Sequence, residues 1–267
     1  MAKLAITLPS FRESPDPAIE VARAAEAAGL DAAFVFDHLF RARGEARRPA
    51  IEGFTLLGAL AVETTRIALG PFVARATLHP PATLAHTLDT VQRVSNGRLI
   101  AGLGAGDHES AAENETFGLE FGSMADRVRA LADAITATSG RGYPVWVGGT
   151  SAAVRTVAAG SEGWNRWGGP VERFARQATG VRAQAARPIT VSWGGLVVVG
   201  EDDAAAARKA DRLQPSADTI VGGPERVAEQ FRAYVDAGAE WIVAGPVDSG
   251  DPENATILGE RVAALLR

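Results

Sequence analysis

Two sets of polar side chains follow apolar runs of this chain and have the types needed for chemistry. Asp37 and His38 come directly after the apolar run 32–36, and Asp107 follows the glycine-rich run Gly102–Gly106. A carboxylate or an imidazole at a strand end can act as a general acid or base, or contact a cofactor. The sequence is equally compatible with Asp37 capping the next turn beside a solvated His38.

Asp107 is followed by His108 and Glu109, so three titratable side chains are adjacent. They could face a pocket, or they could be ordinary solvated loop charges. We expect no metal site, because the segment lacks two regularly spaced histidines with a fixed carboxylate. We also expect no dinucleotide loop, since no amphipathic helix begins at Gly106 and the carboxylates would repel a pyrophosphate.

The segment Gly148-Gly149-Thr150-Ser151 is a candidate binding loop. Two glycines expose backbone N–H groups, and Thr150 or Ser151 can cap and donate at the positive N-terminus of the following helix. This pattern is typical of a phosphate site. It is also typical of an ordinary capped turn, and the residues alone leave both interpretations open.

The run Gly70-Pro71-Phe72-Val73 is expected to interrupt a strand. Proline fixes its own φ and removes a hydrogen-bond donor, which predicts a bulge. Such a bulge could support a planar ligand from behind. The alternative is an irregular strand end before the turn Leu78–Pro81.

The elements that must position these residues alternate between strand and helix. Apolar runs predict strands at 4–8, 32–36, 67–73, 99–103, 145–147, 189–199 and 241–244, and the short segment 164–167 is a further candidate strand. Amphipathic patterns predict helices at 16–28, 51–64, 82–94, 124–138, 151–159, 171–185, 202–213, 224–237 and 252–266, with a polar loop at 104–122. About eight strand–helix pairs predict a (β/α)8 TIM barrel forming a single domain over residues 1–267, with an open doubly wound sheet as the alternative.

The composition narrows the class of ligand. A formal net charge of −5 and a pI near 5.5 argue against nucleic acid or an acidic membrane, and favour a small-molecule substrate. The chain has no cysteine, which excludes disulfides, thiolate nucleophiles and zinc–thiolate sites. No apolar window approaches about 18 residues and no signal-peptide pattern follows Met1, so we expect a cytoplasmic protein.

Several segments, in this order and spacing, also carry a family resemblance: Gly29–Asp31 before Asp37-His38, Thr65–Gly70, Leu84-Ala85, Asn96–Arg98, Gly102–Gly106, Pro144–Gly149, Gly163–Asn165 and Gly223–Glu229. Together they resemble the bacterial luciferase-like family of flavin and deazaflavin oxidoreductases. The family implies a (β/α)8 barrel with an isoalloxazine or deazaflavin ring over the strand ends. Members commonly dimerise through barrel helices, so a homodimer is compatible with the resemblance.

The resemblance also implies roles for individual residues. Phe72–Val73 matches a non-prolyl cis peptide that forms a bulge behind the ring. Asp37 and His38 match a pair on the ring face that is typical of members using coenzyme F-420. Asp107 occupies the position of an acidic residue found in sugar-phosphate-oxidising members, and the loop Gly148–Thr150 matches the loop that binds the cofactor phosphate.

The chain departs from the family pattern at two places. Only a few residues join the helix ending near Thr138 to Pro144, where most relatives carry a long insertion that forms part of a lid, so a more open cleft is expected. His79 stands near the third strand where relatives often have an arginine, which puts the usual contact to the phosphate tail in doubt.

Three hypotheses follow. The first is a coenzyme F-420-dependent oxidoreductase that moves a hydride between the deazaflavin and a small organic substrate, with His38 and Asp107 as proton donors or acceptors. The second is an FMN-dependent monooxygenase that uses molecular oxygen in a dry pocket. The third is a flavin-binding barrel without turnover, suggested by the short lid region.

Overall fold

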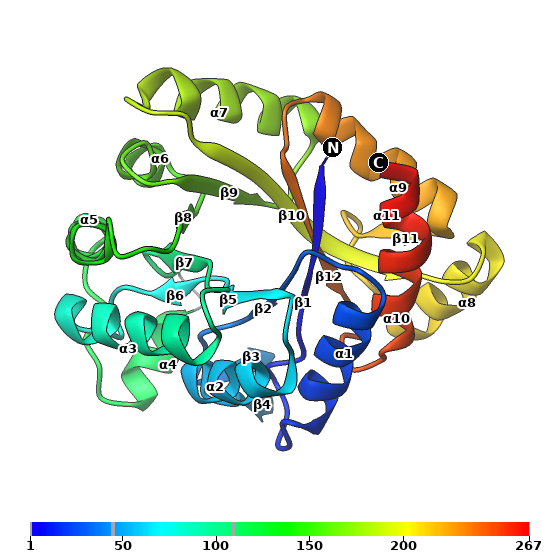
Figure 1. The fold of residues 1–267 in the computed structure, drawn as a ribbon, viewed down its shortest axis with the longest axis horizontal. Helices are drawn as coiled ribbons and strands as arrows, with labels where there is room; N and C mark the ends of the chain where they lie inside the picture. The colour runs from blue at the N-terminus through cyan, green and yellow to red at the C-terminus, as the bar shows by residue number, and fades with distance from the viewer. Residues whose placement is uncertain (1, 44–45, 108–109, 267) are drawn as a thin grey trace.

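Parallel strands form a nearly closed barrel at the centre of the computed structural model, which describes residues 2–43, 46–107 and 110–266. The barrel strands begin and end within a few residues of the predicted positions. They are β1 (Lys3–Thr7), β2 (Ala32–Val35), β5 (Ala68–Pro71), β6 (Ala74–Arg75), β7 (Ala101–Gly104), β8 (Val145–Gly148), β9 (Gly163–Trp167), β10 (Thr190–Val199) and β12 (Trp241–Pro246). Helices alternate with these strands and lie outside them (Figure 1).

The strands pair in the order β5–β2–β1–β12–β10–β9–β8–β7–β6. The ring closes where Leu69 of β5 pairs with Leu99 just before β7, in a single parallel bridge. The short strand β11 (Ile220–Gly222) pairs with β10 outside this ring. The (β/α)8 barrel is therefore confirmed and the open sheet excluded. Since parallel strands bring their carboxyl ends to one end of a barrel, the segments that follow β2, β6, β7 and β8 meet there.

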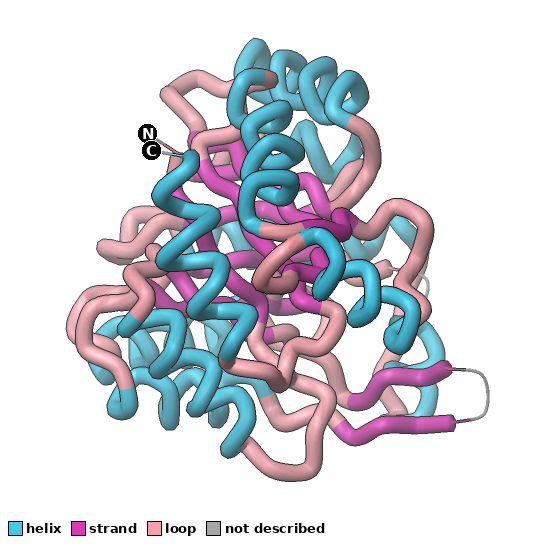
Figure 2. The backbone as a smooth tube through the Cα atoms, turned by 90° about the vertical axis from the view of Figure 1, so that its right-hand side faces the viewer, coloured by secondary structure: helices cyan, strands magenta, loops and turns pink. Residues whose placement is uncertain are grey.

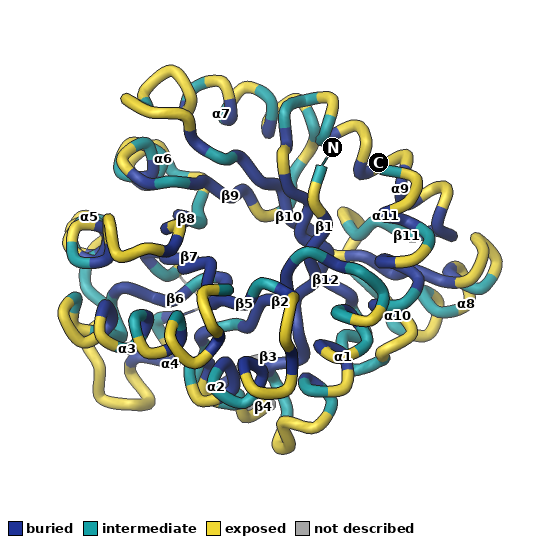
Figure 3. Tube along the Cα trace, in the orientation of Figure 1, coloured by how far each residue is buried: buried dark blue, intermediate teal, exposed yellow. Residues whose placement is uncertain are grey.

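The outer helices bury one face against the strands and expose the other, as the colouring by burial shows (Figure 3). They are α1 (Asp16–Ala27), α2 (Gly53–Glu63), α3 (Pro81–Val94), α5 (Met124–Thr138), α6 (Ala152–Ala158), α7 (Val171–Gln184), α8 (Asp203–Leu213) and α9 (Pro224–Asp236). The predicted last helix is a continuous segment made of α10 (Glu253–Thr256), a π-helical stretch η1 (Ile257–Val262) and α11 (Ala263–Leu266). Within the described residues, no helix is both long and apolar enough to cross a bilayer.

The prediction of a polar loop at 104–122 is wrong, because a short helix, α4 (Ser110–Thr116), forms inside it. A hairpin of β3 (Phe40–Arg43) and β4 (Ala46–Pro49) was not predicted either, and its two strands project from the body at the lower right of Figure 2. Both segments are mostly polar and lack a hydrophobic period, so pattern analysis had no signal for them.

Side chains fill the inside of the barrel. Phe34 stacks on Phe72 with ring centroids 4.9 Å apart, and Trp146 lies edge-on to Trp241 at 5.2 Å. These rings are buried, together with small residues such as Ala5 and Val243. The barrel is therefore a packed core, and space for a ligand exists at its ends and not along its axis.

The short connection Ser139–Pro144 lies at the end of the barrel opposite the strand carboxyl ends, because it leads from α5 into the first residue of β8. Gln92 near the end of α3 donates to the Gly142 carbonyl at 2.9 Å, which holds the connection at that end. The expectation that its shortness opens the cleft is therefore wrong, since this connection does not border the cleft.

Glu26 in α1 fixes the start of β5. Its carboxylate accepts the backbone N–H groups of Thr65, Arg66 and Ile67 at 2.7 to 3.0 Å. Burial works to raise the pKa of Glu26, but these hydrogen bonds outweigh it and lower the pKa from 4.5 to about 2. The ionised carboxylate is therefore the form that stabilises the fold.

We predict that Glu26→Gln lowers the free energy of unfolding at pH 7 by roughly 1–2 kcal/mol, because three backbone donors lose a charged acceptor. The pKa of Glu26 is depressed on folding, so its contribution is complete above pH 4.5 and is lost as the pH falls towards 2. Urea denaturation across this range should show wild type and variant converging in acid. A constant difference down to pH 2 would contradict the assignment.

Candidate active site

A cleft of about 350 Å³ lies at the carboxyl ends of the barrel strands. Its lining comes from the ends of β2, β6, β7, β8 and β9 and consists of Phe36, His38, Phe72, Val73, Arg75, Gly106, Asp107, Ser110, Gly148, Gly149, Thr150, Asn165 and Trp167. The structure therefore brings together every residue predicted for the site except Asp37, which does not line the cleft. His108 and Glu109 lie outside the described residues.

The floor of the cleft is formed where the predicted strand 67–73 is interrupted between β5 and β6. The peptide bond between Phe72 and Val73 is cis, as the family resemblance implied. The Val73 side chain projects over the tips of the neighbouring strands, and a Cβ added at Gly104 or Gly148 would lie 2.4 or 2.8 Å from its methyl groups. The glycines thus make room for Val73, and Phe72 and Val73 form an apolar shelf.

Trp167, at the end of β9, forms an aromatic wall above this shelf. A Cβ at Gly194 of β10 would lie 2.7 Å from the indole ring, and one at Gly245 of β12 would lie 2.8 Å from it. Trp167 also meets Phe72 edge-on, with ring centroids 6.1 Å apart. Trp167 was not predicted as a site residue, although Gly194 and Gly245 inside two strands indicate that a large side chain lies against them.

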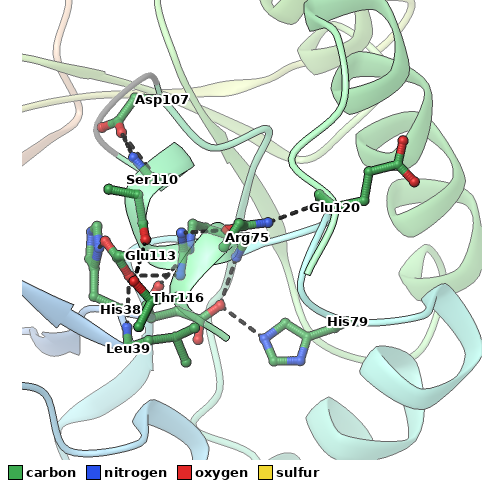
Figure 4. A network of polar contacts seen from close by, with 12 residues as sticks. His38, Leu39, Arg75, His79, Asp107, Ser110, Glu113, Thr116 and Glu120 are labelled. Carbon is green, nitrogen blue, oxygen red and sulfur yellow. Dashed lines mark hydrogen bonds and ion pairs between the residues drawn. The ribbon is translucent and has the colours of Figure 1, made fainter. Parts of the chain in front are cut away.

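His38 is held by a buried carboxylate from α4. Its Nδ1 lies 2.6 Å from Oε1 of Glu113, while Oε2 of Glu113 accepts the backbone N–H of Leu39 at 2.8 Å and an N–H of Arg75 at 2.9 Å (Figure 4). Both Glu113 and Arg75 are buried, whereas His38 is 28% exposed. Glu113 and Arg75 were not predicted as site residues.

The charge of Glu113 decides the proton positions on His38. Burial tends to raise the pKa of Glu113, but the hydrogen bonds from His38 and Leu39 and the charges of His38 and Arg75 together lower it. An ionised carboxylate only accepts hydrogen bonds, so Nδ1 of His38 carries a proton and donates. Nε2 is then the ring nitrogen available to a ligand.

Asp37 supports this arrangement from behind. Its Oδ2 accepts the backbone N–H of Arg75 at 2.8 Å and lies 2.9 Å from Nε2 of His79. Its carbonyl oxygen accepts Nε–H of Arg75 at 3.0 Å. Asp37 is therefore bound to the end of β6 by two hydrogen bonds from Arg75, and its carboxylate also contacts the His79 ring.

Asp107 lies on the exposed rim of the cleft. Its Oδ1 accepts the backbone N–H and the hydroxyl of Ser110, both at 3.1 Å, at the start of α4. In the candidate phosphate loop, Gly149 N–H donates to the Asn165 carbonyl at 3.2 Å, and the Ser151 side chain accepts Val154 N–H at 3.2 Å to cap α6. The Gly149 N–H and the Ser151 hydroxyl are therefore engaged in hydrogen bonds within the protein. Thr150 is the polar residue of the loop that remains on the cleft wall.

The fold is a (β/α)8 barrel with a cleft at the carboxyl ends of its strands and a cis peptide bond at the cleft floor. Barrels of this class bind their ligands at that end. Residues 3–141 match the family model described as luciferase-like monooxygenase, and the chain belongs to that family.

Individual relatives include an F-420-dependent glucose-6-phosphate dehydrogenase from Amycolatopsis mediterranei, 31% identical over 136 residues, which cover 51% of this chain and 40% of that protein. The chain spans about half the length of the curated relatives it matches.

Two solved structures share the fold across nearly the whole chain. The coenzyme F-420-dependent tetrahydromethanopterin reductase from Methanopyrus kandleri has a TM-score of 0.79 at 17% identity, covering 100% of this chain and 99% of that one. The oxygenating constituent of 3,6-diketocamphane monooxygenase from Pseudomonas putida, in complex with FMN, has a TM-score of 0.78 at 14% identity, covering 99% of each.

We predict that Gly104→Ala destabilises the protein by about 1–3 kcal/mol, because the new methyl group overlaps the Val73 side chain. Val73→Ala removes that overlap, so the double variant should be more stable than the sum of the two single changes allows. Thermal unfolding of the four proteins measures this coupling. Gly58→Ala in α2, where an added Cβ meets nothing within 4 Å, is the matched control. Strict additivity of the two changes would contradict the packing described.

Proposed function

We propose that this protein is a coenzyme F-420-dependent oxidoreductase that transfers a hydride between the deazaflavin and a small organic substrate. The observation that carries the proposal is the His38–Glu113 pair, which leaves one imidazole nitrogen available at the cleft of a luciferase-like barrel. The curated relative that requires F-420 matches half of the chain and adds support.

The residues of the cleft fit a flat tricyclic ring. The apolar shelf of Phe72 and Val73 offers one supporting surface, and Trp167 borders the same space. A volume of about 350 Å³ is within the range of small-molecule and cofactor sites. In the proposal Phe72 and Val73 support the ring, and the loop Gly148–Thr150 lies against the phosphate region with Thr150 as its donor, because the Gly149 N–H is engaged by Asn165. Asp37 supports the site from outside the cleft lining, since its carboxylate holds the backbone of Arg75.

In the proposal, the protein's own side chains carry out the proton transfer. The bound deazaflavin supplies the carbon centre that accepts or releases the hydride. Nε2 of His38 takes the hydroxyl proton of an alcohol, or returns a proton to a carbonyl oxygen in the reverse direction. The ionised Glu113 stabilises the imidazolium that forms, and the buried Arg75 forms an ion pair with Glu113. Asp107 on the rim is the second candidate for a proton carrier.

An FMN-dependent monooxygenase is the alternative. The similarity of the fold to a Pseudomonas putida barrel in complex with FMN favours it, because an apolar shelf suits either ring. A barrel that binds a flavin without turnover would need the apolar shelf to hold the ring. It would not need the His38–Glu113 pair, because no proton would be transferred.

Cofactor choice is the first test. Purified protein freed of bound cofactor is titrated separately with F-420 and with FMN, and binding is followed by the fluorescence of each ring. We expect F-420 to bind at least about tenfold more tightly. Retention of FMN alone, together with oxygen uptake when reduced FMN is supplied, would replace the proposal with the monooxygenase.

The role of His38 is tested by kinetics. We expect His38→Gln to lower turnover with F-420 by about 10²- to 10⁴-fold, the usual contribution of a general acid or base. The affinity for F-420 should change far less. Asp107→Asn should have a smaller effect, since Asp107 is exposed and bonded to Ser110. The control is His86→Gln, an exposed position on α3. Equal turnover in His38→Gln and wild type would remove His38 from the chemistry.

A further inference from the structure

A second chamber of about 640 Å³ adjoins the cleft. The two spaces share four lining residues, Phe36, His38, Asp107 and Trp167, so they communicate along that boundary. His38 stands on the boundary with its Nδ1 engaged by Glu113. A molecule in the chamber would therefore meet the same imidazole as a ring on the Phe72–Val73 shelf.

Apolar side chains make up most of the chamber wall. Phe11 stacks on Phe36 with ring centroids 6.0 Å apart and lies 5.5 Å from the ring of His38. Trp167 meets Phe36 edge-on at 6.5 Å. Leu196 of β10, 36% exposed, lies on the same wall. Such a surface gains free energy by taking apolar groups out of water.

The charges of the chamber are acidic. Asp107 and Glu113 line it, and its described lining contains neither lysine nor arginine. Arg75 lines only the neighbouring cleft, and its donors are engaged by Glu113, Asn114 and the Asp37 carbonyl. A phosphate or carboxylate normally requires a nearby cation or several N–H donors. Among the described lining residues such a group would find no cation, and it would lie near the exposed carboxylate of Asp107, since the charge of Glu113 is matched by Arg75.

We infer that the chamber takes a neutral substrate with an apolar body, such as an aryl or branched alkyl alcohol or its ketone. The single polar reacting group of this substrate points towards His38 and its apolar body lies against Phe11, Trp167 and Leu196. This inference rests on the proposed function for the reaction itself. It sets this chain apart from the curated relative named as a glucose-6-phosphate dehydrogenase, whose substrate carries a phosphate.

The test compares two ligands that share a phenyl ring and differ in charge. Calorimetry on the cofactor-free protein measures the binding of 1-phenylethanol and of phenyl phosphate, and the same samples are titrated with F-420. We expect 1-phenylethanol to bind at least about tenfold more tightly than phenyl phosphate. Leu196→Ala should weaken its binding roughly three- to tenfold, because about three apolar carbons are lost from the wall. Leu265→Ala, an exposed leucine on α11, is the matched control and should bind like wild type.

Tighter binding of phenyl phosphate, equal binding by Leu196→Ala and wild type, or no binding of 1-phenylethanol up to its solubility would each overturn the inference. Failure of the proposed function looks different. In that case F-420 does not bind, while 1-phenylethanol still binds and still depends on Leu196.

Discussion

The buried ion pair between Arg75 and Glu113 holds the site together. Arg75 ends β6 and Glu113 lies in α4, so the two charges come from separate segments of the chain. Either charge buried alone would be strongly unfavourable, so each segment depends on the other in the folded protein. Asp37, which follows β2, joins the same network through the backbone and side chain of Arg75. His38 is positioned both by this network, through Glu113, and by its packing against Phe11 and Phe36.

The second constraint on the site is the close packing of Val73 and Trp167 against glycines of neighbouring strands. Val73 lies against the backbone of two neighbouring strands, and Trp167 covers the backbone of two others, and in each case a glycine provides the space. Close packing of a large side chain against glycine therefore accounts for both the floor and the wall of the cleft. Polar groups are few on these two surfaces, so the His38 imidazole faces a largely apolar space in which a hydrogen bond has a large effect.

Hydrophobic pattern was sufficient to predict the barrel, since most of the parallel strands are apolar runs that end near a glycine or a turn; β9 (GWNRW) is an exception. It was also sufficient to place His38, Phe72, Val73, Asp107 and the loop Gly148–Thr150 at one end of that barrel. It could not find α4, because the residues 110–116 are polar and their burial depends on a partner, Arg75, from another part of the chain. The family resemblance implied a place on the ring face for Asp37; in the structure its carboxylate contacts Arg75 and His79, and Asp37 is not among the residues that line the cleft.

In the proposed function, one imidazole nitrogen, fixed by a buried glutamate, serves a flat redox ring resting on the Phe72–Val73 shelf. The decisive measurement is a crystal structure of the protein with F-420 bound. We expect the deazaflavin to lie against Val73 with Nε2 of His38 facing the cleft and Nδ1 still bonded to Glu113. A deazaflavin bound elsewhere on the barrel, or a His38 ring turned away from Glu113, would contradict it.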